Sequence, residues 1–131
     1  MRKLNKIELI SPHWAILGPG GTWEDVLEKI PPEKYTLLHG QCLSVGVGGY
    51  ILGGGVNVVG TSDRYGFAAE HVKQYTMVDA QGNILLVSKN NISTIEPYTR
   101  KLMRTEYDKH DLFYALKGKF KTYSFSMMCV K

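Results

Sequence analysis

The chain has one unusually glycine-rich run, residues 39–55, which holds seven of its fourteen glycines. Glycine loses more conformational freedom on folding than any other residue, so such a run needs a reason in the backbone. The usual reasons are close approach of the main chain to a ligand, or positive φ at several positions. Apolar residues stand among these glycines, so the run is not a flexible linker. We therefore expect a buried segment with a bare backbone face.

The length and composition indicate one globular domain. A chain of 131 residues with 44% hydrophobic residues can bury a core, which argues against disorder. The net charge is +4, and the basic residues are spread along the chain except for a cluster at Lys117, Lys119 and Lys121. We expect a solvated surface and no nucleic-acid partner. The cluster could instead meet an anionic cofactor.

The cysteines leave the cellular compartment open. Cys42 and Cys129 fit no metal-ligand spacing and no Cys-x-x-Cys motif, and two cysteines cannot form a dense disulfide framework. No metal site is expected. No long apolar run follows the basic N-terminus, so this chain is expected to have no signal peptide, membrane span or membrane partner. Asn91-Ile92-Ser93 is a glycosylation sequon, of use only if the chain is secreted.

Two short strands and a helix are predicted near the start of the chain. Apolar residues at 7–10 and 14–17 flank Ser11-Pro12-His13, and this turn signal favours a pair of strands. Residues 23–30 place apolar side chains on one helical face, and Thr22 precedes them as an N-cap. The helix is therefore predicted to pack one face against the sheet.

The middle of the chain predicts short elements joined by glycine turns. Residues 35–38 are predicted as a strand leading into the glycine run, and residues 56–65 as an irregular or helical piece closed by the glycine that follows. Residues 72–78 and 84–87 are predicted to pair as a hairpin, because Gly82 between them can supply a positive φ.

The last third predicts helix and strand. Residues 90–110 are interpreted as an insertion, with a helix over residues 98–107. Asp111 is predicted to cap a helix that ends at Gly118, and residues 122–130 are predicted as a final strand. Short strands paired by hairpins, with helices on one side, indicate an α+β fold with an antiparallel sheet.

Three stretches carry a resemblance to a known family. They are Gly40-Gln41-Cys42-Leu43-Ser44-Val45-Gly46-Val47-Gly48-Gly49-Tyr50-Ile51-Leu52-Gly53-Gly54-Gly55, Arg64-Tyr65-Gly66-Phe67-Ala68-Ala69-Glu70-His71-Val72 and Asp111-Leu112-Phe113-Tyr114-Ala115-Leu116-Lys117-Gly118. The first resembles the flavin-contacting segment of berberine-bridge-enzyme-like FAD-linked oxidases, and the other two are similar to motifs that follow it in that family. The resemblance implies the second lobe of a vanillyl-alcohol-oxidase-type FAD-binding domain. It makes residues 1–131 a single partial FAD-binding domain, with residues 90–110 inserted.

The resemblance implies FAD as cofactor and assigns the residues that would contact it. These are Cys42, Ser44, Val45, Gly46, Gly48, Gly49, Tyr50, Gly53, Gly54 and Val72. Cys42 stands where some members attach FAD covalently, although a small buried thiol is an equally weighted alternative. The glycines, Gly55 included, would offer backbone N–H groups to the flavin, or would serve helix packing instead. Tyr50 replaces a histidine common in the family, and a core tyrosine is its alternative.

Other family features are missing from this sequence. The first lobe's Arg-x-x-Gly-His motif is absent, and Phe120 and Ser124 replace expected glycines. The resemblance implies an oxygen-dependent oxidase of small alcohols, sugars or amines, of which this chain would be the FAD-binding portion, incomplete and inactive alone. No catalytic residue is assigned, and whether the chain is an enzyme stays open. The alternative is a non-catalytic remnant that acts as a binding or self-association module. The family is often secreted, but the localisation is left unassigned.

Overall fold

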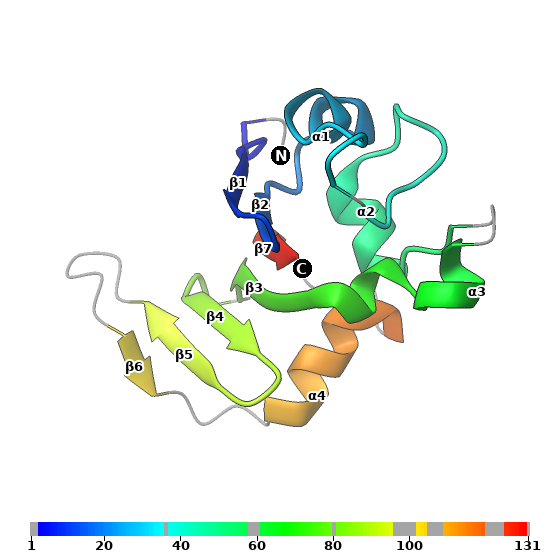
Figure 1. Cartoon of the computed structure of the whole chain (residues 1–131). Coiled ribbons are helices and arrows are strands. Elements are labelled where there is room, and N and C mark those ends of the chain that lie inside the picture. The colour runs from blue at the N-terminus through cyan, green and yellow to red at the C-terminus, as the bar shows by residue number, and fades with distance from the viewer. Residues whose placement is uncertain are drawn as a thin grey trace.

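The computed structural model describes residues 3–35, 37–57, 61–79, 81–95, 102–104, 109–119 and 125–130. The strands among them form one antiparallel sheet in the order β1-β2-β7-β3-β4-β5-β6. Their bounds are β1 Ile7–Ser11, β2 Trp14–Leu17, β3 Val72–Val78, β4 Ile84–Ser88, β5 Ile92–Ile95, β6 Leu102–Arg104 and β7 Phe125–Val130. The predicted α+β class and the two predicted hairpins are confirmed (Figure 1).

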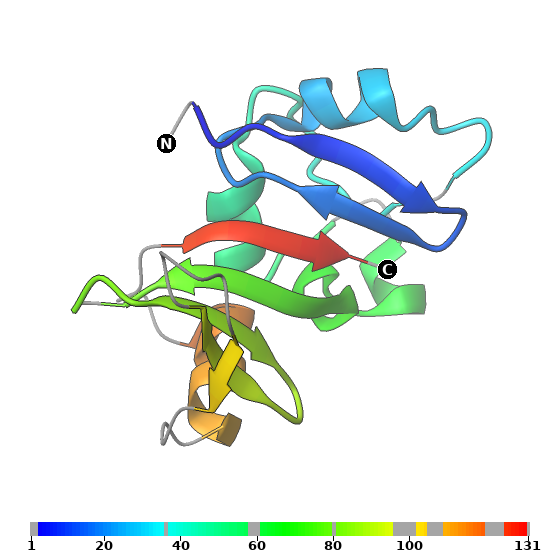
Figure 2. The same ribbon diagram turned by 90° about the vertical axis from the view of Figure 1, so that its left-hand side faces the viewer.

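The last strand joins the two halves of the sheet. β7 lies between β2 and β3, so Val130 is opposite Ala15 on one side and opposite Val72 on the other. Figure 2 shows β7 between the N-terminal hairpin and the β3–β4 hairpin, with the helices behind the sheet. The helices thus cover one face of the sheet, as the sequence predicts.

That covered face carries the core. Side chains alternate between the two faces of a strand, and the buried ones include Leu17, Tyr75, Met77, Leu85 and Val87, each at most 1% exposed. Burying a large apolar side chain contributes about 1.5–3 kcal/mol. The sheet therefore provides a firm base for the helical layer.

The helical layer consists of short elements. They are α1 Trp23–Lys29, α2 Val47–Leu52, α3 Thr61–Tyr65, the 3₁₀ turn η1 Ala68–His71, α4 Lys109–Tyr114 and the helical turn η2 Ala115–Lys119. The predicted helix ends at Gly66 and Gly118 are confirmed, because these glycines have φ angles of 78° and 98°. In the β3–β4 hairpin Gly82 has a φ of 88°, also as expected.

The N-terminus of α1 is fixed by a reciprocal pair of hydrogen bonds. The N–H of Thr22 donates to Oδ2 of Asp25 over 2.7 Å, and the N–H of Asp25 donates to Oγ1 of Thr22 over 3.3 Å. The hydrogen bonds from Thr22, backbone first, lower the pKa of Asp25 below its ordinary value. The predicted N-cap is confirmed. It fixes the N-terminal end of α1, to which the glycine run is hydrogen-bonded.

Three local predictions are wrong. Tyr35, Leu37 and Leu38 form no strand, because the chain turns at Pro31, whose carbonyl accepts from both Lys34 and Tyr35. The predicted helix at 98–107 is contradicted at Leu102–Arg104, which extend the sheet as β6, while residues 98–101 and 105–107 lie outside the described residues. Asp111 is no N-cap, because α4 begins two residues earlier at Lys109.

Candidate cofactor site

The glycine run divides into an exposed loop, a short helix and a turn. Residues 41–46 form the loop, and α2 with the turn at 53–55 follows. The expectation that the run is buried is therefore wrong for its first part. The physical reason is that the loop crosses the N-terminal end of α1 and satisfies its backbone from outside. The N–H groups of Trp23 and Glu24 donate to the carbonyls of Val45 and Leu43 over 3.2 and 3.0 Å.

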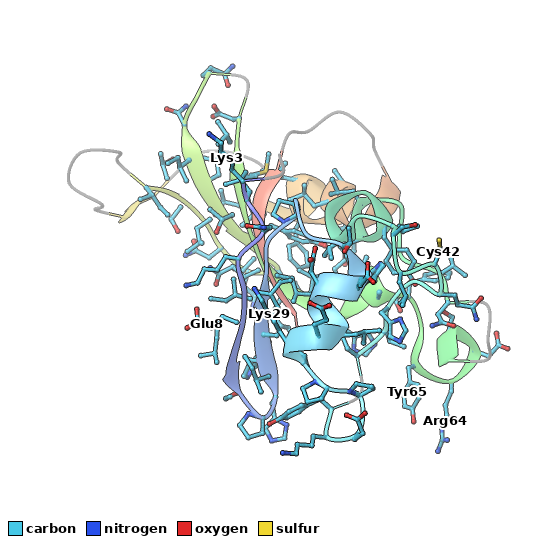
Figure 3. All side chains as sticks on the ribbon, turned by 90° about the horizontal axis from the view of Figure 1, so that it is seen from above. Lys3, Glu8, Lys29, Cys42, Arg64 and Tyr65 are labelled. Carbon is cyan, nitrogen blue, oxygen red and sulfur yellow. The ribbon has the colours of Figure 1, made fainter. Side chains whose placement is uncertain are left out.

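Cys42 projects from this loop. Its side chain is exposed, and its Sγ lies 3.3 Å from Oγ of Ser44. Figure 3 shows the sulfur at the periphery of the molecule, pointing outward. The alternative of a small buried thiol is thereby excluded. An exposed thiol on a loop anchored by main-chain hydrogen bonds is accessible to a bound molecule without any rearrangement of the core.

The helix α2 has one packed side and one open side. Val47, Gly48 and Ile51 are buried on the packed side. Gly46 and Gly49 are exposed and Gly53 follows at the C-cap, a spacing of three and four residues that places them on one face. The open side therefore presents bare backbone from the Cys42 loop to the end of the helix.

Packing explains several of the glycines. A Cβ atom on Gly48 would lie 2.7 Å from Cβ of Pro19, and one on Gly40 would lie 2.9 Å from Nε1 of Trp23. A Cβ on Gly55 would lie 2.7 Å from Cβ of Ala68. These glycines allow α2 and its flanking segments to pack closely against Pro19, α1 and η1, as the packing alternative proposed.

No comparable packing contact explains why residue 49 is a glycine. A Cβ atom there would meet nothing within 4 Å, and the residue is helical with no positive φ. Gly54 is equally open, but its φ of 96° itself requires glycine. A Cβ on Gly46 would meet only the carbonyl oxygen of Gly21, at 3.9 Å. Gly49 is thus unexplained by any contact or backbone constraint among the described residues.

The backbone donors of the run are already partly used. The N–H groups of Gly48, Gly53 and Gly54 donate to carbonyls of Pro19, Gly49 and Ile51. The expectation that they point to a cofactor is therefore corrected, because helix formation and packing use them first. Gly46 and Gly49 have N–H groups with no backbone acceptor within the described part of the chain.

Tyr50 points away from the open side. Its ring meets the indole of Trp23 edge to face, with centroids 5.1 Å apart, and a Cβ on Gly55 would lie 2.9 Å from the same ring. Its hydroxyl is buried without a hydrogen-bond partner among the described residues, and this burial raises the pKa of Tyr50. This is the core tyrosine that the sequence left as an alternative.

Val72 lies outside the open site. It is 1% exposed at the start of β3, and its N–H donates to the carbonyl of Ala69. A contact to a ligand through this N–H would first require that bond to break. Val45 and Ser44, by contrast, are exposed on the loop beside Cys42.

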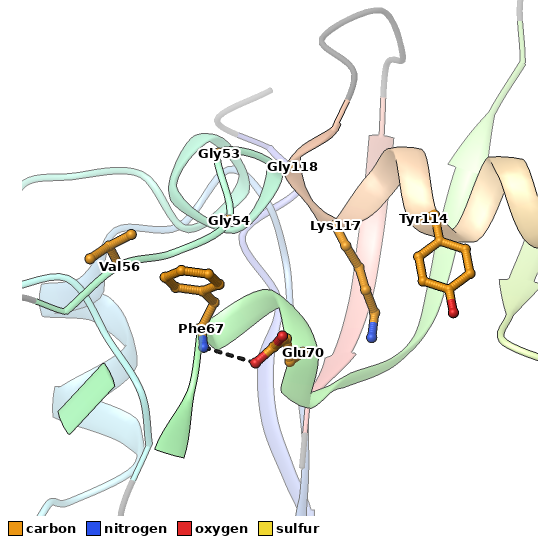
Figure 4. A pocket seen from close by; sticks show the side chains of 8 residues that line it. All are labelled: Gly53, Gly54, Val56, Phe67, Glu70, Tyr114, Lys117 and Gly118. Carbon is orange, nitrogen blue, oxygen red and sulfur yellow. Dashed lines mark hydrogen bonds between the residues drawn. The ribbon is translucent and has the colours of Figure 1, made fainter. Parts of the chain in front are cut away.

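A cavity of about 410 Å³ lies where the open side of α2 ends. Figure 4 shows Gly53 and Gly54 along one edge, with side chains from η1, α4 and η2 around it. Its lining consists of Gly53, Gly54, Val56, Phe67, Glu70, Tyr114, Lys117 and Gly118. Because Gly53 belongs both to the open face and to the lining, the face and the cavity are continuous.

Two opposite charges line this cavity. Desolvation by burial lowers the pKa of Lys117, and Glu70 opposes that shift. The Nζ of Lys117 lies 4.8 Å from the centroid of the Phe113 ring, which holds the ammonium group by a cation–π contact. Oε2 of Glu70 accepts the Phe67 N–H over 3.1 Å. A partly desolvated ammonium group is a natural partner for an anionic ligand.

Sequence reasoning missed most of the cavity lining. Phe67 and Glu70 stood inside a quoted motif, as did Tyr114, but none was assigned to the site. Lys117 belongs to the third stretch and to the basic cluster that could meet an anionic cofactor, but it too is not among the assigned site residues. The available signal was the presence of all three family-like stretches in one chain, because residues from each of them line the same cavity.

Comparison with known proteins identifies a cofactor class. A family model described as an FAD binding domain matches residues 1–88. The FAD-dependent monooxygenase drtC of Aspergillus calidoustus is 32% identical over 102 residues, which cover 78% of this chain and 16% of that protein. An uncharacterized FAD-linked oxidoreductase of Arthroderma benhamiae is 38% identical over 71 residues, 54% of this chain and 14% of that protein. The chain thus spans about a sixth of these relatives.

Solved structures share the fold. Glucooligosaccharide oxidase of Acremonium strictum, studied for its 6-S-cysteinyl, 8α-N1-histidyl FAD, superposes with a TM-score of 0.77 at 22% identity, over 100% of this chain and 24% of that one. Xylooligosaccharide oxidase of Myceliophthora thermophila gives 0.73 at 23% identity, over 99% of this chain and 24% of that one. At these identities the likeness shows the fold alone. None of the helices described is both long and apolar enough to span a membrane.

Proposed function

Because the chain belongs to the FAD-binding-domain family, we propose that it holds the flavin end of FAD against the open side of α2 for an FAD-linked oxidoreductase. In this proposal the ring lies over Gly46 and Gly49, between the Cys42 loop and the cavity. Backbone without side chains permits a flat ring to approach closely, and the N–H groups of these two glycines are available as donors.

The observation that carries this proposal is the presence of a glycine at position 49, inside α2, where no packing contact requires one. Glycine inside a helix costs about 1 kcal/mol relative to alanine. No contact within the described chain offsets that cost, since a Cβ there would meet nothing within 4 Å. Close approach of a ligand offsets it, and bare backbone beside a cavity is where a flat ligand fits. The exposed thiol at the adjoining loop is consistent with the same occupant.

Cys42 is proposed as a covalent attachment point for the flavin. The side chain is exposed, lies on an anchored loop and has only the hydroxyl of Ser44 beside it. The cysteinyl FAD of the glucooligosaccharide oxidase supports an attachment of this kind in a protein of the same fold. The histidine of an Arg-x-x-Gly-His motif does not occur in this sequence, so any attachment through these residues would be by the thiol alone.

The cavity is proposed to receive the more polar part of FAD. The ammonium group of Lys117 would meet phosphate, and desolvation strengthens a charge pair of this kind. The carboxylate of Glu70 would accept from a ribose hydroxyl. The ring of Phe67 is 48% exposed at the cavity and offers an apolar surface beside both charges.

When bound, FAD would accept a hydride from the substrate. The residues named above would hold and orient the FAD. Oxygen-dependent oxidation of a small alcohol, sugar or amine is the proposed activity of the whole protein. Neighbours of the same fold named as oligosaccharide and nicotine oxidases support this substrate class. The chain covers about a quarter of those structures, so we expect it to be inactive without further polypeptide.

The proposal is tested by titrating the purified chain with FAD and recording the quenching of flavin fluorescence and the visible spectrum. Saturable binding by protein whose fold is verified by circular dichroism is expected. ADP and riboflavin are titrated separately. The affinity for ADP reports on the cavity, and the affinity for riboflavin reports on the open side of α2. A folded chain that leaves the flavin spectrum and fluorescence unchanged up to millimolar FAD would contradict the proposal.

A further inference from the structure

The sequon Asn91-Ile92-Ser93 lies at the turn between β4 and β5, and it contains none of the residues proposed to hold FAD. The turn is tight and well fixed. The N–H of Ser88 donates to the carbonyl of Asn91 over 2.8 Å, and Oγ of Ser88 donates to the same carbonyl over 3.0 Å. These bonds hold the backbone of Asn91 and leave its side chain outside the ladder.

The Asn91 side chain itself is free to carry a large group. The residue is exposed, and within the described part of the chain its amide has no hydrogen-bond partner. Lys89 and Asn90, which form the tip of the turn, are exposed as well. A bulky polar substituent at this position therefore displaces neither a core side chain nor a hydrogen bond.

We propose that Asn91 is an N-glycosylation acceptor. In this step Nδ2 of Asn91 forms a bond to the anomeric carbon of an N-acetylglucosamine-ended oligosaccharide. The bond between that carbon and a polyisoprenoid diphosphate breaks, the lipid diphosphate leaves, and Nδ2 gives up one proton. The step requires an oligosaccharyl-lipid donor, its membrane-bound transferase and entry of the chain into the secretory compartment that holds both, and no electrons are exchanged.

The fold requires this transfer to precede the completion of the sheet. Ile92 is fully buried and Ser93 is 8% exposed. Ser93 also pairs with Leu86 in β4 and with Arg104 in β6. A transferase must reach the side chain of Ser93 as well as that of Asn91, and the folded chain presents only the latter. Glycosylation at Asn91 is therefore a modification of the chain during synthesis.

A glycan at Asn91 would stand near the beginning of α4. α4 packs against β4, and Figures 1 and 2 both show the β4–β5 turn near the end of the sheet where α4 begins. The cavity residue Tyr114 ends α4 and Lys117 follows in η2, where its ammonium group is repelled by the charge of Lys89 at the tip of the β4–β5 turn. The glycan would thus be attached two residues from a lysine that interacts with the charged lining of the cavity.

The test is translation of the full chain, preceded by a cleavable secretion signal, into endoplasmic-reticulum microsomes. A C-terminal tag with an Asn-x-Thr acceptor reports entry into the lumen by one glycan. Two glycans, removable by peptide N-glycosidase, are expected on the unmodified chain, and one on Asn91→Gln and on Ser93→Ala. The matched control Asn90→Gln changes the neighbouring exposed asparagine and should keep two.

A single glycan on the unmodified chain would overturn the proposal, because the tag proves that the lumen was reached. Two glycans on Asn91→Gln would overturn it equally. For the timing, the purified folded chain and a urea-unfolded chain are each diluted rapidly into solubilised transferase and donor, so that the second sample meets the enzyme while it refolds. Modification of the unfolded sample alone is expected, whereas equal modification of both would refute the requirement for an open sheet.

Discussion

The N–H of Gly48 donates to the carbonyl of Pro19 over 3.3 Å, and a Cβ on Gly48 would lie 2.7 Å from Cβ of Pro19. A Cβ atom on the next residue, Gly49, would meet no other atom within 4 Å. Two adjacent glycines therefore serve different purposes: one lets α2 pack against the preceding segment, and the other leaves its outer side bare. This contrast provides a matched pair for separating folding from cofactor binding.

Alanine at each of these glycines should have opposite effects on stability. Gly48→Ala is expected to lower the free energy of unfolding by about 1–3 kcal/mol, because the new methyl group overlaps Pro19. Gly49→Ala should raise it by up to about 1 kcal/mol, since alanine favours helix and meets no neighbour. Urea denaturation followed by circular dichroism measures both changes.

The same Gly49→Ala variant should bind FAD less well, and Gly49→Leu less again. A loss of about tenfold, equivalent to about 1.4 kcal/mol, is expected for alanine if the flavin lies directly on this residue. Fluorescence titration provides the dissociation constants. Undiminished FAD affinity in a stably folded Gly49→Leu variant would place the flavin elsewhere.

Serine at position 42 should abolish covalent attachment without affecting the fold. The Cys42 side chain is exposed, so Cys42→Ser should change the free energy of unfolding by no more than about 0.5 kcal/mol. Flavin fluorescence that remains with the protein after denaturation measures the attachment. Ser44→Ala removes only the neighbouring hydroxyl and serves as the control, which should keep the bond. Flavin still attached to Cys42→Ser protein would assign the attachment to another residue.

Removal of the Lys117 charge should separate stability from affinity. Burial lowers the pKa of Lys117, so holding the charged ammonium group in the folded chain carries a desolvation cost that an exposed lysine does not have. Lys117→Met should therefore leave the ligand-free chain as stable as before, or more so. Its affinity for FAD and for ADP should fall, whereas riboflavin, which has no phosphate, should be unaffected.

Lys34→Met, at an exposed lysine that does not line the cavity, is the control for a general charge effect. Equal losses of ADP affinity in both variants would show that net charge, and not the cavity, governs binding. Isothermal titration calorimetry at two salt concentrations distinguishes these cases.

The capping of α1 should make stability depend on pH. The pKa of Asp25 is lowered in the folded chain by the Thr22 hydrogen bonds, so its ionised form favours folding. This contribution is fully present above the ordinary carboxyl pKa, and it is lost as pH falls through the lowered folded value. Asp25→Asn should cost about 1 kcal/mol at pH 7 and progressively less in acid.

Glu24→Gln provides the comparison, because Glu24 lies in the same first turn and is exposed. It should change stability much less at every pH. A pH-independent difference between Asp25→Asn and the unmodified chain would show that the carboxylate of Asp25 does not contribute through its ionisation. Thermal denaturation between pH 3 and 7 measures the effect in all three proteins.

Local sequence signals succeeded where the chain contacts its own near neighbours. The β3–β4 hairpin was predictable because Gly82 and alternating burial specify it within a few residues. The N-cap at Thr22 was equally local. Leu102–Arg104 were misread as helix because β6 depends on β5 for its hydrogen bonds, a partner that spacing alone does not specify. The family motifs correctly indicated the cofactor class, FAD.

The sequence by itself determined that a glycine-rich run with a cysteine would be central to this protein, because conformational cost makes such a run conspicuous. It could not determine which glycines pack and which lie open. That was decided only when Pro19 met Gly48, Ala68 met Gly55 and nothing met Gly49. The physical reason is that a glycine's role depends on what lies within a few ångströms of its missing side chain. Those neighbours come from other elements, which only the tertiary structure brings together.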